Sequence, residues 1–358
     1  MSSGKEPIRV LVVDDSPTMA DAVSALLTDD PRIEVVGRAN TGSRAVTLAR
    51  LLRPDVITMD LLMPDLDGPA AIAAIMAEAP ARILVVSAVA DQRNLDVCFQ
   101  AMSAGALELI GKPTVTSGDE LRRWGRQLAE SVCLMAEVPV ISRRIRPPSP
   151  PPAVTGARVD IFGLAASTGG PPALSEVLSR LPADLPVPIV IAQHITEGFT
   201  PGMVRWLSQV TSLKVVIGKE GERLEPGRVY FPLDGHDLTV EGNGVVRLTR
   251  TRGGPCPSGD LLLSSLARTY GSRAGGGVLT GMGEDGARGL LDIKKVGGVT
   301  FAQDETSSVV FGMPRVAIEL KATDRGVPLS AIPDIIRMSC RRPPSMPNSR
   351  PSGPEGVA

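Results

Sequence analysis

The feature that most constrains this chain is a repeated alternation of short apolar runs with helix-like stretches. In the first part of the chain, the runs IRVLVVDD, IEVVGRA, DVITMD, RILVVSA and ALELIGKP are typical of strands. Helix-like segments such as SPTMADAVSALLTDD and PAAIAAIMAEA separate them. Strands joined by helical crossovers run parallel, so we expect a parallel sheet that is covered by helices on both faces.

A second block repeats this pattern with the strand-like runs RVDIFGLA, PIVIAQH, KVVIG, RVYFPL, GGGVLTG and GVTFAQD. The segment HDLTVEGNGVVRLTR differs, because apolar and polar residues alternate on both sides of Gly242-Asn243-Gly244. This alternation predicts a β-hairpin. The second block is therefore expected to be a doubly wound, mostly parallel α/β domain that carries one hairpin.

Two segments rich in proline separate and follow these blocks. A length of 358 residues favours two domains. Residues 138–158 are rich in proline and arginine and predict an extended linker, and the residues from 341 onward have the character of a disordered tail. We expect a first domain at 6–125, a linker at 126–157, a second domain at 158–338 and a tail at 339–358.

Composition excludes several classes of function. The net charge of −1 and the aromatic content of 3% argue against nucleic-acid binding. No apolar run approaches the ~18 residues of a membrane span, so no membrane insertion is expected and the protein is predicted to be soluble and cytoplasmic. Its cysteines show neither disulfide nor zinc spacing: Cys98, Cys133, Cys256 and Cys340.

In the first block, polar residues follow the predicted strands where a parallel sheet gathers its functional groups. They are Asp14, Asp15, Asp60, Ser87 and Lys112. Three converging carboxylates repel one another unless they share a cation, and Mg²⁺ prefers oxygen ligands. The lysine and the hydroxyl would suit the oxygens of a phosphoryl group. A single acid would more simply be a solvated helix cap, but the five positions together favour a phosphoryl and metal site.

In the second block, the segment GLAASTGGPPAL is either a phosphate cradle or a turn that presents Ser167 as a nucleophile. It lacks the middle glycine of a dinucleotide loop and the lysine of a Walker loop, so the phosphate cradle is rejected. A serine nucleophile needs a base, and His194 ends the next predicted strand, while Asp285 lies in a glycine-rich turn at another strand end. From chemistry alone these three could equally be a helix cap, a buried imidazole and a turn residue.

The motifs VLVVDDSPTM, DVITMDLLMPDLDG, VVSA and ALELIGKP resemble the receiver domain of two-component response regulators, which has a flavodoxin-like fold. The resemblance implies that Asp60 accepts a phosphoryl group from a histidine kinase and that Ser87 and Lys112 sense it. It also implies a Mg²⁺ ion that is held by Asp14, Asp15, Asp60 and the backbone carbonyl of Leu62. Leu109 stands where such receivers usually carry an aromatic switch residue.

The motifs GLAASTGGPPAL, IAQHITEGFTPGM, LTGMGEDGARGL and FAQDETSSVVFGMPRVAI resemble the catalytic domain of chemotaxis protein-glutamate methylesterases. The resemblance implies a Ser167–His194–Asp285 triad, with the backbone N–H groups of Thr168 and Met282 as the oxyanion hole. It implies no cofactor for the ester chemistry. Cys256 replaces an arginine that is often found in the family, and His236, which follows FPLDG, is interpreted as a cleft or loop residue and not as a second base.

Together the two resemblances imply a phosphorylation-regulated hydrolase that removes methyl groups from glutamate γ-methyl esters of chemoreceptor-type proteins. Deamidation of specific glutamines through the same acyl-enzyme is also implied. The unphosphorylated receiver is expected to pack over the rim that carries Ser167. Two alternatives remain: a non-enzymatic response regulator whose second domain binds a partner, and a hydrolase or deamidase for a different protein substrate.

Overall fold

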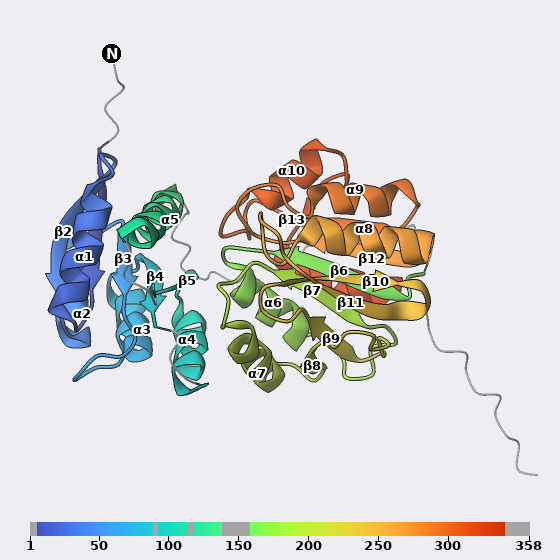
Figure 1. Ribbon diagram of the computed structural model, residues 1–358, viewed down its shortest axis with the longest axis horizontal. Helices are drawn as coiled ribbons and strands as arrows, with labels where there is room; N and C mark the ends of the chain where they lie inside the picture. The colour runs from blue at the N-terminus through green and yellow to red at the C-terminus, as the bar shows by residue number, and fades with distance from the viewer. Residues whose placement is uncertain (1–5, 89–91, 114–117, 138–157, 341–358) are drawn as a thin grey trace, which may run out of the picture.

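The computed structural model describes residues 6–88, 92–113, 118–137 and 158–340 of the chain. It contains two α/β units, each built on its own parallel sheet (Figure 1). The helices lie on both faces of these sheets, as the strand–helix alternation predicts. Most of the expected linker and tail, at 138–157 and 341–358, lies outside the described residues.

The first sheet has the strand order β2-β1-β3-β4-β5 and is parallel throughout. This is the flavodoxin-like order, so the expected fold is confirmed. The order reverses between β1 and β3, which brings the residues that follow these two strands together at one edge. The strands are β1 (Ile8–Val13), β2 (Ile33–Ala39), β3 (Val56–Met59), β4 (Arg82–Ser87) and β5 (Glu108–Gly111).

Five helices cover this sheet, and the last continues beyond residue 125, the expected end of the first domain. They are α1 (Pro17–Thr28), α2 (Gly42–Leu52), α3 (Gly68–Glu78), α4 (Gln92–Ala104) and α5 (Gly118–Glu137). Leu128, Val132 and Met135 on α5 are buried in the core beside α1. Residues 126–137, for which the sequence predicts a linker, are therefore a continuous part of this helix.

The second sheet has the order β14-β13-β12-β6-β7-β9-β8, again parallel throughout. Beside it, β10 (His236–Glu241) and β11 (Val245–Arg250) form the expected antiparallel hairpin. The strands of the sheet are β6 (Ile161–Ala166), β7 (Ile189–Gln193), β8 (Lys214–Ile217), β9 (Arg228–Phe231), β12 (Ala274–Val278), β13 (Val299–Gln303) and β14 (Gly326–Val327).

The helices of this unit are α6 (Gly170–Ser179), α7 (Thr200–Val210), α8 (Gly259–Tyr270), α9 (Ala287–Lys295), α10 (Met313–Glu319) and α11 (Ile332–Ser339). Beyond α11, Cys340 is buried and forms a parallel bridge with Val159, just before β6. The unit therefore includes Ser339 and Cys340, for which the sequence predicts a place in the tail.

The described part of the chain contains no helix that is long and apolar enough to cross a membrane. All four cysteines are free thiols, as their spacing predicts.

The two units pack against each other through α4 and α7. The rings of Phe99 and Trp206 are stacked with centroids 5.5 Å apart, and Trp206 Nε1 donates a hydrogen bond of 3.0 Å to the Ser103 hydroxyl. Arg205 forms an ion pair of 2.6 Å with Asp96 at the same contact. A Cβ on Gly202 would lie 2.7 Å from the Leu95 Cβ, so the helices approach this closely because residue 202 has no side chain.

Candidate active site and phosphorylation site

Ser167 lies in the turn between β6 and α6, at the carboxyl edge of the second sheet. Helix α6 begins after Gly169, which has a left-handed φ of 74° and provides no side-chain cap. Ser167 is therefore not the cap of this helix, and that structural alternative is rejected. The turn is held tightly from the opposite side, because a Cβ on Gly281 would lie 2.7 Å from the Ser167 Cβ.

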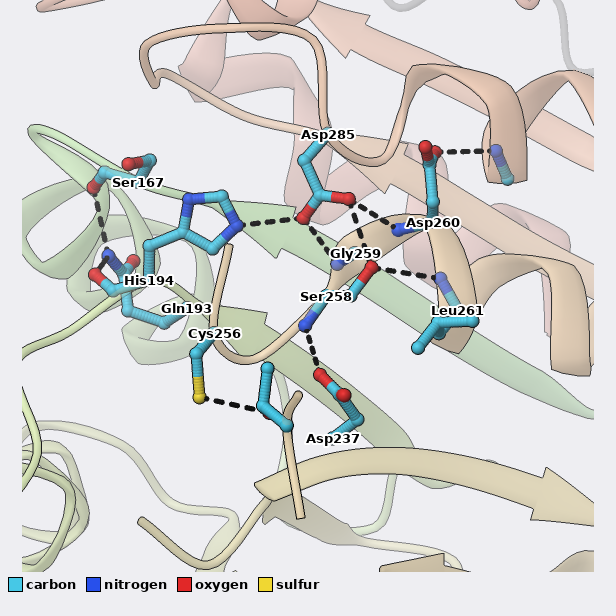
Figure 2. Close-up of polar contacts among 12 residues, drawn as sticks. Ser167, Gln193, His194, Asp237, Cys256, Ser258, Gly259, Asp260, Leu261 and Asp285 are labelled. Atoms are coloured by element: carbon cyan, nitrogen blue, oxygen red, sulfur yellow. Dashed lines mark hydrogen bonds and ion pairs between the residues drawn. The ribbon is translucent and has the colours of Figure 1, made fainter. Parts of the chain in front are cut away.

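His194 directly follows β7, the neighbour of β6, and its Nε2 lies 2.8 Å from Asp285 Oδ2. Figure 2 shows the imidazole between Ser167 and Asp285. Because Nε2 contacts the carboxylate, Nδ1 is the ring nitrogen left for a hydroxyl. In the described residues no hydrogen bond joins the Ser167 hydroxyl to the ring, although both side chains line one cavity of about 340 Å³.

The Asp285 carboxylate lies at the N-terminus of α8 (Figure 2). Its Oδ2 accepts a hydrogen bond of 2.6 Å from Gly259 N, and its Oδ1 accepts bonds from Asp260 N and the Ser258 hydroxyl at 3.0 and 3.1 Å. Burial raises the pKa of Asp285, but His194 and these backbone donors outweigh it, so the net pKa is lowered. A helix N-terminus also favours an anion. The carboxylate is thus held ionised and in one orientation.

The backbone N–H groups of Thr168 and Met282 donate no hydrogen bond to any described residue. The two turns that carry them are tied together by Thr280, whose hydroxyl donates to Thr168 O at 2.9 Å and whose carbonyl accepts from Ser167 N at 3.0 Å. Two free N–H groups on linked turns beside a serine can stabilise an oxyanion.

Gln193 is a buried residue of the site that the sequence does not predict. Its Nε2 donates to the carbonyl oxygens of Ser167 and His194 at 2.9 and 2.8 Å, so one amide joins the backbones of both residues. Its only sequence signal was its place at the end of a strand, next to His194. A similar glutamine, Gln303, accepts from Thr280 N at 2.8 Å.

Three positions depart from the family patterns described above, and the structure places them differently relative to the cavity. Cys256 lines the same cavity as Ser167 and His194. His236 begins β10, contacts the Asp234 carbonyl through Nδ1 at 2.8 Å and does not line the cavity. Leu109 lies on β5 of the first unit and also lines this cavity. The first unit therefore forms one wall of the site.

The acids of the first unit converge at the carboxyl edge of its sheet. Asp14, Asp15 and Asp60 each offer a carboxylate oxygen, and these atoms lie within 4.8 Å of one another. Lys112 Nζ lies 2.8 Å from both Asp14 and Asp60. Ser87, at the end of β4, is buried, and its carbonyl accepts from Lys112 N at 2.8 Å.

The charges in this pocket depend on one another. Burial raises the pKa of Asp60, and Lys112 opposes this only in part. Burial lowers the pKa of Lys112, but the two carboxylates outweigh it and the net pKa is raised. Oxygen ligands at this separation fit the Mg²⁺ ion that receiver domains typically bind. The Leu62 carbonyl belongs to the loop that follows β3 and Asp60.

Comparison with known proteins gives one consistent result. Residues 162–336 match the CheB methylesterase family, and residues 10–122 match the response regulator receiver domain family. The chain is 72% identical to protein-glutamate methylesterase/protein-glutamine glutaminase 3 of Myxococcus xanthus, over 98% of this chain and 99% of that protein. It is 44% identical to protein-glutamate methylesterase/protein-glutamine glutaminase 2 of Anaeromyxobacter dehalogenans, over 94% of this chain and 98% of that protein. The crystal structure of the Thermotoga maritima CheB methylesterase catalytic domain is 34% identical, covers 50% of this chain and 98% of that chain, and has a TM-score of 0.48.

Proposed function

Because the chain belongs to the family of protein-glutamate methylesterases/protein-glutamine glutaminases, we propose that it hydrolyses glutamyl γ-methyl esters on methylated chemoreceptor-type proteins and releases methanol. Deamidation of specific glutamines to glutamates is its second activity. The single observation that carries the proposal is the His194–Asp285 pair, whose imidazole lines the same cavity as Ser167.

In the first half of the reaction, the Ser167 hydroxyl attacks the ester carbonyl and His194 Nδ1 takes its proton. Asp285 holds the Nε2–H side of the ring and stabilises the imidazolium that forms. The N–H groups of Thr168 and Met282 donate to the oxyanion. One such donor typically lowers the barrier by ~2.7–4 kcal/mol. The imidazolium then protonates the leaving methanol, and an acyl-enzyme remains.

In the second half, water attacks the acyl-enzyme while His194 Nδ1 takes a proton from it. Collapse of the second tetrahedral intermediate returns that proton to Ser167 and frees the glutamate. A glutamine follows the same route with ammonia as the leaving group. The amide is the poorer substrate because its leaving group is more basic and needs its proton earlier.

The test is the Ser167→Ala variant of the full chain, assayed for methanol release from methylated receptor. We expect turnover to fall by at least ~10³-fold, since a triad without its nucleophile retains only binding and oxyanion effects. Ser179→Ala, an exposed serine at the end of α6, is the matched control and should behave as wild type. Wild-type turnover in Ser167→Ala would contradict the proposal.

The first unit regulates this activity. Asp60 accepts a phosphoryl group from a histidine kinase, and Ser87 and Lys112 contact its oxygens. Asp14, Asp15, Asp60 and the Leu62 carbonyl would hold Mg²⁺, which when bound offsets the negative charge of the carboxylates and the phosphoryl oxygens. Phosphorylation replaces the carboxylate charge of Asp60 with about −1.5 to −2 charges on the phosphoryl group, which alters the Lys112 ion pairs and favours release of the unit from the Ser167 rim.

A partial response is expected, because complete switching between the closed and open forms needs ~5.5 kcal/mol of differential stabilisation. The test is Asp60→Asn with a small-molecule phosphodonor and Mg²⁺. The variant should keep its basal methanol release and lose stimulation. Stimulation that survives in Asp60→Asn would place the phosphoryl group elsewhere.

A further inference from the structure

A dipeptide of the first unit, Leu107–Glu108, enters the cavity that contains Ser167. The Leu107 carbonyl accepts a hydrogen bond of 3.2 Å from Gly169 N. Glu108 Oε1 accepts a longer bond of 3.4 Å from the Thr168 hydroxyl. Both residues line the cavity together with Ser167 and His194. The first unit thus does more than cover the site: it satisfies two donors of the turn that presents the nucleophile.

The occupant has the chemical form of the substrate residue. It is a glutamyl side chain, preceded by a peptide carbonyl, and the proposed reaction leaves a glutamyl residue within a peptide. We propose that Leu107–Glu108 is an internal mimic of the glutamyl substrate and that Thr168 Oγ1 and Gly169 N–H are the groups that bind the substrate's side chain and the main-chain carbonyl before it. This inference rests on the proposed function and adds its substrate-binding residues and the form of its inhibition.

The surroundings of Glu108 favour an uncharged carboxyl. No lysine or arginine lines the described cavity, and its other titratable side chains are His194, beyond Ser167, and Cys256. Apart from these two side chains, the walls from α4, α5 and the loop after β7 carry only apolar and uncharged polar groups there. Burial raises the pKa of Glu108 to about 7, and the bond from Thr168 opposes this only weakly. An uncharged carboxyl resembles the uncharged ester or amide of a substrate.

The mimic links closure to proton uptake. A glutamate in water has a pKa near 4.5, and in the closed form this one titrates near 7. A raised pKa in the closed form means that closure is most favourable below about pH 4.5 and loses that advantage as pH rises to about 7. The unphosphorylated protein should therefore open as pH rises, by on the order of tenfold in the closure equilibrium between pH 5.5 and 7.5.

The first test is the ratio of unphosphorylated to phosphorylated methanol release by the full chain across this pH range. The ratio cancels the pH dependence of the chemical step itself, which is common to both forms. In wild type it should rise with pH. In Glu108→Gln, which stays uncharged, it should be flat, and in Glu108→Ala it should be high throughout.

Two controls separate the mimic from a general loosening of the interface. Asp96→Asn breaks the Arg205 pair outside the cavity, so it should raise the ratio at every pH and keep the slope. Glu34→Gln, at an exposed position on β2, should change neither the ratio nor its slope with pH. A slope that persists in Glu108→Gln, or a basal rate unchanged in Glu108→Ala, would overturn the inference.

The second test concerns Thr168. Thr168→Val keeps the backbone N–H and removes the hydroxyl, so in the phosphorylated protein it should raise KM about two- to tenfold, as expected for one lost hydrogen bond. Its kcat should change less than its KM, because the backbone N–H is retained, and Thr168→Ser should restore KM. An unchanged KM in Thr168→Val would overturn the assignment of the hydroxyl.

Direct binding needs no turnover. Acetyl-Leu-Glu-amide should bind the phosphorylated Ser167→Ala protein in calorimetry more tightly than acetyl-Leu-Asp-amide does, and Thr168→Val should remove that difference. Equal binding of both peptides would overturn the mimic. If wild type released no methanol, the proposed function would fail instead, and the two failures are therefore distinguishable.

Discussion

At the scale of single residues, the site depends on a carboxylate with three donors besides the imidazole. The net pKa of Asp285 is lowered, so the charge it lends to His194 is present at every pH above its ordinary value of 3.8 and is lost only as pH falls below that. The donors from Ser258, Gly259 and Asp260 also leave the carboxylate one orientation. The same donors therefore keep the Asp285 carboxylate ionised and fix its orientation toward His194.

Asp285→Asn should lower kcat by on the order of 10³-fold or more, because an amide can present its N–H to the imidazole and favour the wrong tautomer. The measurement is steady-state methanol release with phosphorylated protein. Asp324→Asn, an exposed partner of Lys294, serves as the control and should leave kcat unchanged. A fall of less than tenfold in Asp285→Asn would show that the carboxylate does not orient the base.

Gly281→Ala should damage the site without unfolding the domain. The new Cβ would lie 2.7 Å from the Ser167 Cβ and 2.4 Å from the Met313 sulfur, so the turn of the nucleophile must move. We expect kcat to fall at least tenfold with a loss of a few degrees in Tm. Gly242→Ala, with open space around it, is the control. Full activity in Gly281→Ala would mean that the turns of Ser167 and Gly281 can move apart without loss of catalysis.

The sequence could predict where much of the proposed site lies in the fold, and the reasons why it could not predict the rest are physical. Asp60 and His194 directly follow apolar runs, so the predicted strands are enough to place both residues at the edges of their sheets. Thr168 and Met282 were predicted only by resemblance, since a free N–H leaves no mark on the side chain. Gln193 was missed because an amide that binds backbone carbonyls has no titratable or nucleophilic group to attract notice.

At the scale of elements, the N-terminal cap of helix α8 also contacts Asp285, the carboxylate of the proposed triad. Ser258 caps the helix by accepting from Leu261 N at 3.2 Å, and the same hydroxyl donates to Asp285. The alternation of strands and helices predicted both sheets and the hairpin. It did not predict that α5 continues to Glu137, because only contact with α1 makes Leu128 and Val132 core residues.

Ser258→Ala should lower the free energy of unfolding by about 1 kcal/mol, the usual value of a lost cap, and should also lower kcat because Asp285 loses a donor. Thr41→Ala removes the cap of α2, where the side chain accepts from Arg44 N, and should cost similar stability without a change in kcat. Denaturant unfolding and methanol release separate the two effects. Equal kcat in both variants would contradict the link to Asp285.

At the scale of the whole molecule, the contact between α4 and α7 sets how tightly the first unit covers the site. Sequence could not predict this contact, since Phe99 and Trp206 read as ordinary apolar positions on separate helices.

Gly202→Ala should push the helices apart at Leu95 and raise unphosphorylated turnover severalfold, with the phosphorylated rate unchanged. Gly242→Ala, which meets open space beside the β10–β11 hairpin, is the control. An unchanged basal rate in Gly202→Ala would show that closure does not limit access.

The pairing of Val159 with Cys340 brings the first and last residues of the catalytic unit side by side. Strand β6 runs from this point toward Ser167, so both ends lie at the margin of the sheet that faces away from the chemistry. The unit can accordingly be spliced into a host loop, or closed into a circular permutant with new ends in the β10–β11 turn, while its catalytic face stays unobstructed.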